Sequence, residues 1–471
     1  MNINRTHHYT PTSQPKVLVA FLVAIALLSL LLAMPAEAHA DVRTADVIAG
    51  ATVEERDLTV SECPSISSEQ AVLIDEEGTV YFERDAYGPA QIASITKVMT
   101  AIVAIENAPD DLYIAVSANA ASIGESSAEL QEGDILDFDT ALKALLVPSG
   151  NDAALALAES IGAKMMLKDP SLGSDPVQVF VDAMNKKADE IGCKDTVYEN
   201  THGLDYDEYA GNLHSTAYDQ ALVARYALSY PKIRDIVSGG STSITVKRNG
   251  EDVTIDLETT DQLLDMYEYA IGVKTGRTEL AGPCFMGAAD NNGKMLYAVV
   301  LSAEDEYQRF VDCENLFDWG YNNIKNLKLA NTTEFMEARG GVGETDIPVI
   351  ARTVHADWPD QTVAVTLEDP DAAITVFALE GNVSQSIQLE DAHGTVHVGD
   401  KLGTITFKQH NREVAQFDLV ACENVPGPNP LDSFIIWWQR LFGGFNGGDE
   451  SAEPVIYNVM PIIDNNVINA G

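Results

Sequence analysis

The sequence predicts an α/β or α+β domain, in which helices cover one sheet, followed by a small all-β domain. Between residues 71 and 321 a strand pair comes first, then several helical segments, then further strands. From Gly340 to Cys422, short alternating runs lie between Gly, Asp and Pro turns, which is typical of all-β domains. A length of 471 residues is too long for one ordinary core and agrees with two or three domains.

Composition indicates a globular, strongly acidic protein. Hydrophobic residues make up 46% of the chain, and 29 Lys and Arg face 72 Asp and Glu, for a formal charge of −43. No basic face can form against this excess of carboxylates, which argues against nucleic acid as a partner. The charge points to no particular chemistry.

Residues 1–40 are expected to be a signal peptide. Arg5 and Lys16 form a basic start, Val17–Met34 carries no charge, and Ala38-His39-Ala40 offers a cleavage site. An uncleaved anchor is the alternative, because the apolar run is about long enough to span a bilayer. We therefore expect an extracytoplasmic protein, associated with the outer face of the cytoplasmic membrane or with the cell wall. A variable stretch over 41–69 follows.

The next elements are predicted from apolar patterns. Ala71–Phe82 resembles a hairpin around a Glu-Gly turn, and Ile92–Glu106 is apolar almost all round, as in a buried helix. Asp139–Ile161 contains two helical patterns broken at Pro148-Ser149-Gly150. Further helices are expected within 176–229 and over Arg309–Tyr321, and strands over Val246–Leu257, Ala270–Val273, Gly282–Ala288 and Lys294–Leu301.

The C-terminal region contains a proline-rich linker and an amphipathic segment. The linker is Pro426–Pro430, and Ser433–Phe442 combines two Trp, one Arg and dense aliphatic residues before a thin acidic tail. The segment is too short to span a membrane and fits a helix lying on a membrane surface. A helix docked on the β domain is the alternative.

The cysteines and histidines indicate no metal site. The five cysteines are spread widely, without a CxxC or a Cys/His cluster; they are Cys63, Cys193, Cys284, Cys313 and Cys422. Isolated buried thiols are favoured over the two disulfides that could form. His393 and His397 are four apart but lie in a segment of strand character. No metal and no other cofactor is expected.

Three short motifs occur in order: Ser94-Ile95-Thr96-Lys97, Ser149-Gly150-Asn151 and Lys274-Thr275-Gly276. Each is weak alone; a lysine can snorkel, Ser-Gly-Asn can cap a helix, and a strand can turn at a glycine. In the first motif, a serine hydroxyl needs a nearby base, and Lys97 lies one turn on. Its apolar surroundings favour the neutral amine, which can serve as that base.

The other two motifs supply polar groups that a substrate needs. Ser149 could relay a proton and Asn151 could hold an amide, since both lie in a turn between helices. Thr275 can donate to a carboxylate, and Lys274 adds positive potential. Gly276 lets a substrate backbone approach an edge strand closely.

Together these motifs resemble the low-molecular-mass penicillin-binding proteins, the serine D-alanyl-D-alanine carboxypeptidases. Further stretches are similar to that family: 145–159 (LLVPSGNDAALALAE), 199–205 (ENTHGLD), 214–226 (HSTAYDQALVARY), 272–285 (GVKTGRTELAGPCF) and 309–321 (RFVDCENLFDWGY). The resemblance implies a penicillin-binding-protein-like catalytic domain at 70–328, with a helix-covered antiparallel sheet. It also implies a β-rich domain at 335–424 and, over 425–471, the linker, the amphipathic segment and the tail.

The resemblance also implies an activity and roles for the motif residues. The expected reaction removes the terminal D-Ala from peptidoglycan stem pentapeptides through an acyl-enzyme, with β-lactams as covalent inhibitors. Ser94 would be acylated and Lys97 would be its base, with Ser149 and Asn151 assisting. Lys274, Thr275 and Gly276 would receive the terminal carboxylate. The backbone N–H groups of Ser94 and Arg277 would form the oxyanion hole.

Two departures from the family pattern are expected to touch no motif residue: Ile92 stands where proline is common, and Thr259-Thr260-Asp261 replaces Asn-Thr-Asn. Because the protein is acidic, Lys274 and Arg277 are predicted to form a local positive patch for the substrate carboxylate.

Three other functions stay open. A D,D-endopeptidase or transpeptidase would differ only in the acyl acceptor. A class A β-lactamase would need Asp where Gly150 stands and a deacylating Glu, for which Glu199-Asn200 is a superficial candidate. A non-catalytic peptidoglycan-binding protein is disfavoured by the intact motifs.

Overall fold

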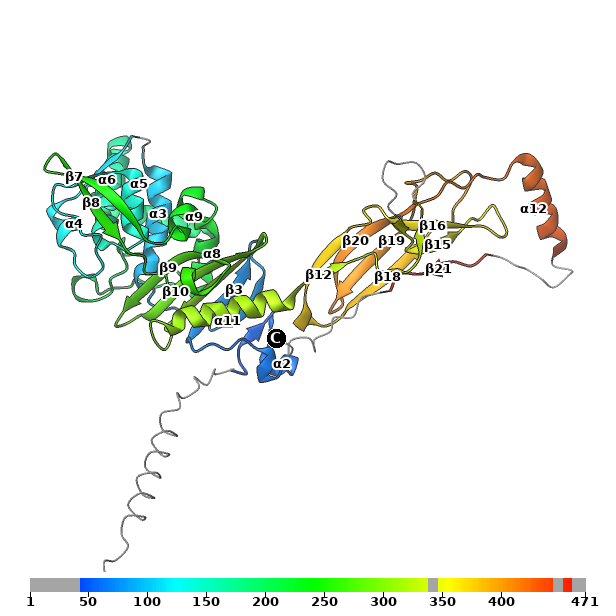
Figure 1. The fold of residues 1–471 in the computed structure, drawn as a ribbon, viewed down its shortest axis with the longest axis horizontal. Coiled ribbons are helices and arrows are strands. Elements are labelled where there is room, and N and C mark those ends of the chain that lie inside the picture. The colour runs from blue at the N-terminus through cyan, green and yellow to red at the C-terminus, as the bar shows by residue number, and fades with distance from the viewer. Residues whose placement is uncertain (1–42, 110, 338–345, 444–451, 460–471) are drawn as a thin grey trace, which may run out of the picture.

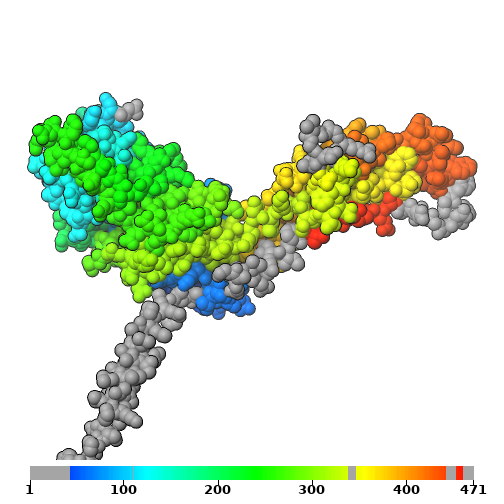
Figure 2. Space-filling model, in the orientation of Figure 1, coloured from blue at the N-terminus to red at the C-terminus, as the bar shows by residue number. Residues whose placement is uncertain are grey.

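A computed structural model describes residues 43–109, 111–337, 346–443 and 452–459 (Figure 1). The expected signal peptide at 1–40 lies outside these ranges, as does most of the acidic tail. The described chain forms an α+β unit and an all-β unit that follow one another along an elongated molecule (Figure 2). This confirms the predicted fold class.

The α+β unit is built on a seven-stranded antiparallel sheet, in the order β2-β1-β4-β3-β11-β10-β9. The expected hairpin is β3 (Gln70–Asp75) and β4 (Val80–Arg84). After the helical segments the chain returns as β9 (Ala270–Thr278), β10 (Gly282–Asn291) and β11 (Lys294–Leu301). The strand that carries Lys274-Thr275-Gly276 is therefore an edge strand, as predicted.

The stretch over 41–69 adds the other edge of this sheet. It contains β1 (Val47–Ile48), β2 (Ala51–Thr52), α2 (Val53–Arg56) and η1 (Val60–Glu62), and β1 pairs with β4. Asp46 forms an ion pair with Arg84 at 2.6 Å, and both side chains are buried. Breaking one partner of such a pair leaves an uncompensated buried charge, so this stretch is integral to the domain.

Both faces of the sheet are covered, which is why its central strands are apolar without alternation. Val72 and Ile74 of β3 join a core with α3 (Thr96–Asn107), while Ala71 and Leu73 join a second core with α11 (Gln308–Asn323). The predicted helices are α5 (Phe138–Leu146), α6 (Asn151–Lys168), α7 (Pro176–Ile191), α8 (Ala217–Ala227) and α11; the structure adds α4 (Ala118–Ser122), α9 (Pro231–Ser238) and α10 (Leu263–Met266).

Two strand predictions need correction. Val246–Leu257, expected as one strand, belongs to a hairpin of β7 (Thr242–Arg248) and β8 (Glu251–Leu257). In a small four-stranded sheet β7 pairs with β6 (Ile135–Asp137), which pairs in turn with β5 (Tyr113–Ala115). Asn249 and Gly250 form its turn at φ +54° and +88°, the left-handed conformation that Asn-Gly turns favour. The strand expected to end at Val273 continues as β9 through the whole motif to Thr278.

The all-β unit has one six-stranded sheet and two short pairs. The six-stranded order is β18-β19-β20-β16-β15-β21, and the pairs are β12-β17 and β13-β14. The strands are β12 (Ile324–Lys328), β13 (Phe335–Met336), β14 (Ile347–Pro348), β15 (Ala351–Val354), β16 (Thr362–Leu367), β17 (Ala373–Phe377), β18 (Val383–Leu389), β19 (Lys401–Gln409), β20 (Arg412–Ala421) and β21 (Val455–Ile456). Because β12 pairs with β17, this unit begins directly after α11 and not at 335.

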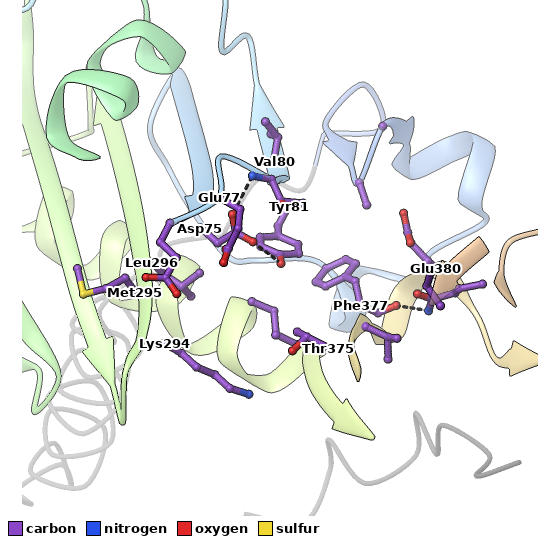
Figure 3. A pocket seen from close by; sticks show the side chains of 18 of the residues that line it. Asp75, Glu77, Val80, Tyr81, Lys294, Met295, Leu296, Thr375, Phe377 and Glu380 are labelled. Atoms are coloured by element: carbon purple, nitrogen blue, oxygen red, sulfur yellow. Dashed lines mark hydrogen bonds between the residues drawn. The ribbon is translucent and has the colours of Figure 1, made fainter. Parts of the chain in front are cut away.

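The junction between the units is packed. Phe377 belongs to the core under α11, with its ring centroid 5.0 Å from Tyr81 and 5.4 Å from Trp319. Arg56 donates from Nη1 to the Leu379 carbonyl at 3.2 Å. A cavity of about 590 Å³ runs along this junction, with the carboxylates of the β3–β4 turn on one side and Glu380 on the other (Figure 3).

The amphipathic segment forms α12 (Pro430–Gly443) at the far end of the all-β unit (Figure 1). Among the residues described, no helix has both the length and the apolar character needed to cross a bilayer. All five cysteines are free thiols; four are buried and Cys422 is half-buried, as the isolated-thiol interpretation predicted.

Candidate active site

Ser94 lies in a strained turn. It is the middle residue of η2 (Ala93–Ile95), which leads directly into α3, and Ala93 before it has φ +48°. An alanine in the left-handed region persists only where surrounding packing holds it. A Cβ on Gly203, which has φ +88°, would lie 1.8 Å from the Ala93 carbonyl oxygen. The loop over 199–205 therefore presses against the turn and requires glycine there.

Lys97 contacts Ser94 directly. Its Nζ donates to Ser94 Oγ at 2.8 Å and to the His202 carbonyl at 3.0 Å, and the side chain is fully buried. Burial holds the pKa of Lys97 well below its ordinary value, and the nearby Lys274 lowers it further. A deprotonated amine beside a serine hydroxyl is a general base in position. The snorkelling alternative is wrong, because the amine does not reach solvent.

Asp152 opposes part of this lowering of the Lys97 pKa. It was not predicted from the sequence. It lies within electrostatic reach of Lys97 and acts to raise the pKa of that lysine. Its carboxylate accepts bonds from Ser127 Oγ at 2.7 Å and from the backbone N–H groups of Ala128 and Leu130 at 3.0 and 3.1 Å. It thereby holds the loop over 127–130 against the start of α6.

Ser149 and Asn151 keep polar atoms free at the start of α6. Ser149 is buried with φ +67°, and its Oγ bonds to no residue that the structure describes. Asn151 donates from Nδ2 to the Gly124 carbonyl at 3.1 Å, while its Oδ1 has no partner in the described chain. Gly150 is the N-cap, without a side-chain cap bond, so the helix-cap alternative does not explain these residues.

The strand β9 brings the third motif against the first. A Cβ on Gly276 would lie 2.8 Å from the Ile92 carbonyl oxygen and 3.2 Å from Ser94 N, so any side chain there would displace the turn. Thr275 Oγ1 lies 2.6 Å from Thr260 Oγ1. Lys274 donates from Nζ to the Thr275 carbonyl at 2.9 Å.

The predicted positive surface patch is wrong. Lys274 is 1% exposed, and burial together with Arg309 lowers its pKa to about 7. Arg277 is half-exposed but lies 3.2 Å from Glu306 and 3.8 Å from Glu279, so its charge is neutralised. The positive potential is inside the protein, beneath β9, where it acts through a lower dielectric constant than at the surface.

Two polar residues near β9 were not singled out from the sequence. Arg309 of α11 is buried and donates from Nη1 to the Gly276 carbonyl at 3.1 Å; no described residue partners its Nε. Arg309 is the first residue of the family-like stretch 309–321, and that resemblance is the sequence signal by which it could have been found. Thr260 does contact motif residue Thr275, so the expectation that the 259–261 departure touches no motif residue is wrong.

The residues of the β-lactamase alternative have structural roles in their own loop. Glu199 is exposed and accepts the Asn212 N–H at 2.6 Å. Asn200 donates to the Leu204 carbonyl at 2.9 Å and accepts from the Gly203 N–H at 2.6 Å. Neither side chain is presented to Ser94 as a deacylating base.

Buried His202 predicts sensitivity to acid. Burial, with Lys97 nearby, lowers its pKa to about 3, so the folded protein holds it neutral. An unfolded histidine takes up a proton near pH 6.5, so this stability is present above pH 6.5 and is lost as the pH falls toward 3. We expect this residue to remove about 2 kcal/mol of unfolding free energy between pH 7 and pH 5. Urea unfolding at both pH values checks this, with His202→Asn expected to flatten the difference; an equal slope in the variant would contradict it.

Comparison with known proteins identifies the family to which this chain belongs. The family model described as D-alanyl-D-alanine carboxypeptidase, peptidase family S11, matches residues 57–305, more than half of the chain. The chain belongs to this family. It is therefore a serine-type D-alanyl-D-alanine carboxypeptidase, a hydrolase, and the recognition made from its motifs is confirmed.

Individual relatives of the carboxypeptidase agree. It is 26% identical to the D-alanyl-D-alanine carboxypeptidase DacF of Bacillus subtilis over 384 residues, which cover 80% of this chain and 89% of DacF. It is 30% identical to DacD of Escherichia coli over 283 residues, 56% of this chain and 66% of DacD. The crystal structure of the Streptomyces K15 DD-transpeptidase matches with 27% identity and a TM-score of 0.51, over 55% of this chain and 98% of that one.

Proposed function

We propose that this carboxypeptidase removes the terminal D-Ala from peptidoglycan stem peptides through an acyl-enzyme on Ser94. The observation that carries the proposal is the 2.8 Å bond between Lys97 Nζ and Ser94 Oγ, with the lysine fully buried. Family membership supports the substrate class, the part in cell-wall metabolism and covalent binding of β-lactams, whose strained amide presents an equivalent carbonyl to the serine.

The reaction proceeds by two acyl transfers. Ser94 Oγ attacks the carbonyl between the two D-Ala residues while Lys97 Nζ takes the hydroxyl proton. The peptide C–N bond breaks, and the leaving D-Ala nitrogen receives that proton, with Ser149 as the relay. Water then attacks the ester carbonyl and gives a proton to the base; the ester bond to Ser94 Oγ breaks, the serine oxygen regains that proton, and the shortened peptide is released. The backbone N–H groups of Ser94 and Arg277 would stabilise the oxyanion in both steps.

The substrate ends in a carboxylate, which we assign to the groups on and beneath β9. Thr275 can donate its hydroxyl, and Lys274 and Arg309 supply buried positive charge. Gly276 leaves room for the substrate backbone along the edge strand, and Asn151 can hold a peptide amide. Buried charges facing a carboxylate are worth more than exposed ones because water screens them less.

A D,D-transpeptidase or endopeptidase activity is the second candidate, since only the acyl acceptor differs and a solved relative is titled a DD-transpeptidase. One assay separates them. The protein is incubated with a peptide ending in Lys-D-Ala-D-Ala, with and without glycine as an amine acceptor. Free D-Ala with the water-hydrolysed peptide supports the carboxypeptidase. Mainly amide product would support transpeptidation, and no D-Ala under any pH tried would contradict both.

As the second part of our proposal, we infer that the protein acts outside the cytoplasm, on a membrane surface. The charge-free run Val17–Met34 supports export. In α12, Phe434, Trp437, Trp438 and Leu441 are between 51% and 57% exposed, although each is large and apolar. Arg440 holds the helix to the all-β unit by donating to the Ala356 carbonyl at 2.7 Å. Such a helix can insert aromatic rings among lipid headgroups while staying attached to the domain.

Vesicle binding is expected to depend on these rings. The full chain should co-sediment with phosphatidylcholine vesicles, and replacing both Trp437 and Trp438 by Ser should reduce binding roughly tenfold or more, because two large apolar groups no longer leave water. Tyr113→Ser, which removes an exposed aromatic residue of β5, is the matched control and should bind like the parent. Equal binding by the double variant and the control would contradict the membrane proposal.

A further inference from the structure

Asp261 is a buried carboxylate that the acyl-transfer steps do not use. It is 5% exposed and lies just before α10. Its Oδ1 accepts the Leu263 N–H at 2.9 Å, while its Oδ2 is buried and bonds to no residue that the structure describes. A buried carboxylate with only one bond has little compensation for its lost hydration.

The position of Asp261 connects it to the carboxylate-binding strand. It follows Thr260, whose Oγ1 lies 2.6 Å from Thr275 Oγ1, and Thr275 Oγ1 lies 3.4 Å from Lys274 Nζ. The charged and titratable groups that face Asp261 are Lys274 on β9, Arg309 on α11, Asp265 on α10 and Cys313 on α11. No ion pair with Asp261 forms in the described chain, so it acts on Lys274 through space.

Lys274 needs such an anion. Burial and Arg309 both disfavour its ammonium form, whereas Asp261 favours the charged form. Burial in turn raises the pKa of Asp261 to about 7, and Lys274 and Arg309 oppose that rise. Each group therefore stabilises the ionised form of the other, as two opposite charges in a low dielectric do.

We propose that Asp261 is the counter-ion that keeps Lys274 charged in the free enzyme, and that the substrate's terminal carboxylate takes over this role in the complex. Asp261 is thus a positioning residue, which acts through Lys274 and touches no reacting atom. The inference rests on the proposed function, because it needs Lys274 to receive a carboxylate. The inference predicts that loss of Asp261 weakens binding of the substrate to the free enzyme. The kcat of the saturated complex should change little.

The test follows acylation by benzylpenicillin, which carries a carboxylate, together with D-Ala release across pH 6 to 9. In Asp261→Asn the pKa of Lys274 should fall, so the alkaline decline of the second-order acylation rate should begin at lower pH. We expect the rate at pH 8 to drop about 3- to 10-fold relative to the parent, corresponding to a shift of half to one pKa unit. At pH 6 the difference should be under about twofold, and kcat for D-Ala release should change little, since the bound carboxylate replaces the lost anion.

Two variants keep this test decisive. Glu268→Gln removes an exposed carboxylate just beyond α10 and should leave the pH profile unchanged. Asp261→Glu is the second variant, for use if Asp261→Asn folds poorly. It retains the negative charge and should keep the alkaline midpoint of the parent. Identical pH profiles in the parent and Asp261→Asn, or equal losses in kcat and binding at every pH, would overturn the inference. Absence of any acylation in the parent would instead refute the proposed function.

Discussion

Ser94→Ala is expected to abolish D-Ala release and covalent labelling by fluorescent penicillin together. Removing a catalytic nucleophile eliminates the covalent route, so kcat should fall by at least about 10⁴-fold. The turn should remain intact. It depends on the backbone conformation of Ala93 and on the close approach of Gly276, and not on the Ser94 hydroxyl. The measurement is the rate of D-Ala release, with gel fluorescence reporting the acyl-enzyme.

The matched control is Ser238→Ala, which removes an exposed serine hydroxyl at the end of α9. It should leave both readouts and the melting temperature unchanged. Persistent labelling of Ser94→Ala would show that another residue is acylated and would refute the assignment of the nucleophile.

Lys97→Met is expected to slow acylation by about 10²- to 10⁴-fold, the range that a well-placed general base contributes. Methionine fills a similar volume, and removing a buried amine removes its cost of desolvation, so the free energy of unfolding should not decrease by much. In the parent, acylation needs the neutral amine, so its rate should fall as the pH drops through the pKa of Lys97, which lies well below the ordinary lysine value. The variant should lose this acid limb. Stopped-flow acylation by a chromogenic cephalosporin measures both effects.

Lys186→Met is the control for this variant, since Lys186 is exposed on α7 and forms an ion pair with Glu190 at 3.7 Å. It should acylate at the parent rate. A Lys97→Met protein that acylates within twofold of the parent would mean that another group accepts the serine proton.

Much of the fold and the site could be predicted because local pattern and packing agree here. Ile92–Glu106 has almost no polar face, and nine of the twelve residues of α3 are buried. The burial of Lys97 follows from the same pattern. Motif order then predicted that Ser94 and Lys274-Thr275-Gly276 meet, and the close approach of Gly276 to the turn shows that they do.

Most of the predictions that were wrong concern contacts between segments that are far apart in the sequence. Nothing local to Lys274 shows whether its amine faces solvent, because that depends on β9 lying at a sheet edge with Arg309 beneath it. The contact of Thr260 with Thr275 likewise depends on tertiary packing. The hairpin turn at Asn249-Gly250 is different: Asn-Gly is a strong local turn signal, and the prediction of one strand over Val246–Leu257 overlooked it.

The shared core at the junction has a mechanical consequence. Since Phe377 packs among Tyr81 and Trp319, the all-β unit is anchored to the catalytic sheet by side-chain packing as well as by the chain itself. Bending there would expose aromatic surface to water, which is unfavourable. In the membrane arrangement that we propose, the all-β unit would hold the catalytic domain at a set height above the lipid, because α12 lies at its opposite end (Figure 1). Wall peptides at that height, and not those lying against the lipid, would be the ones that it trims.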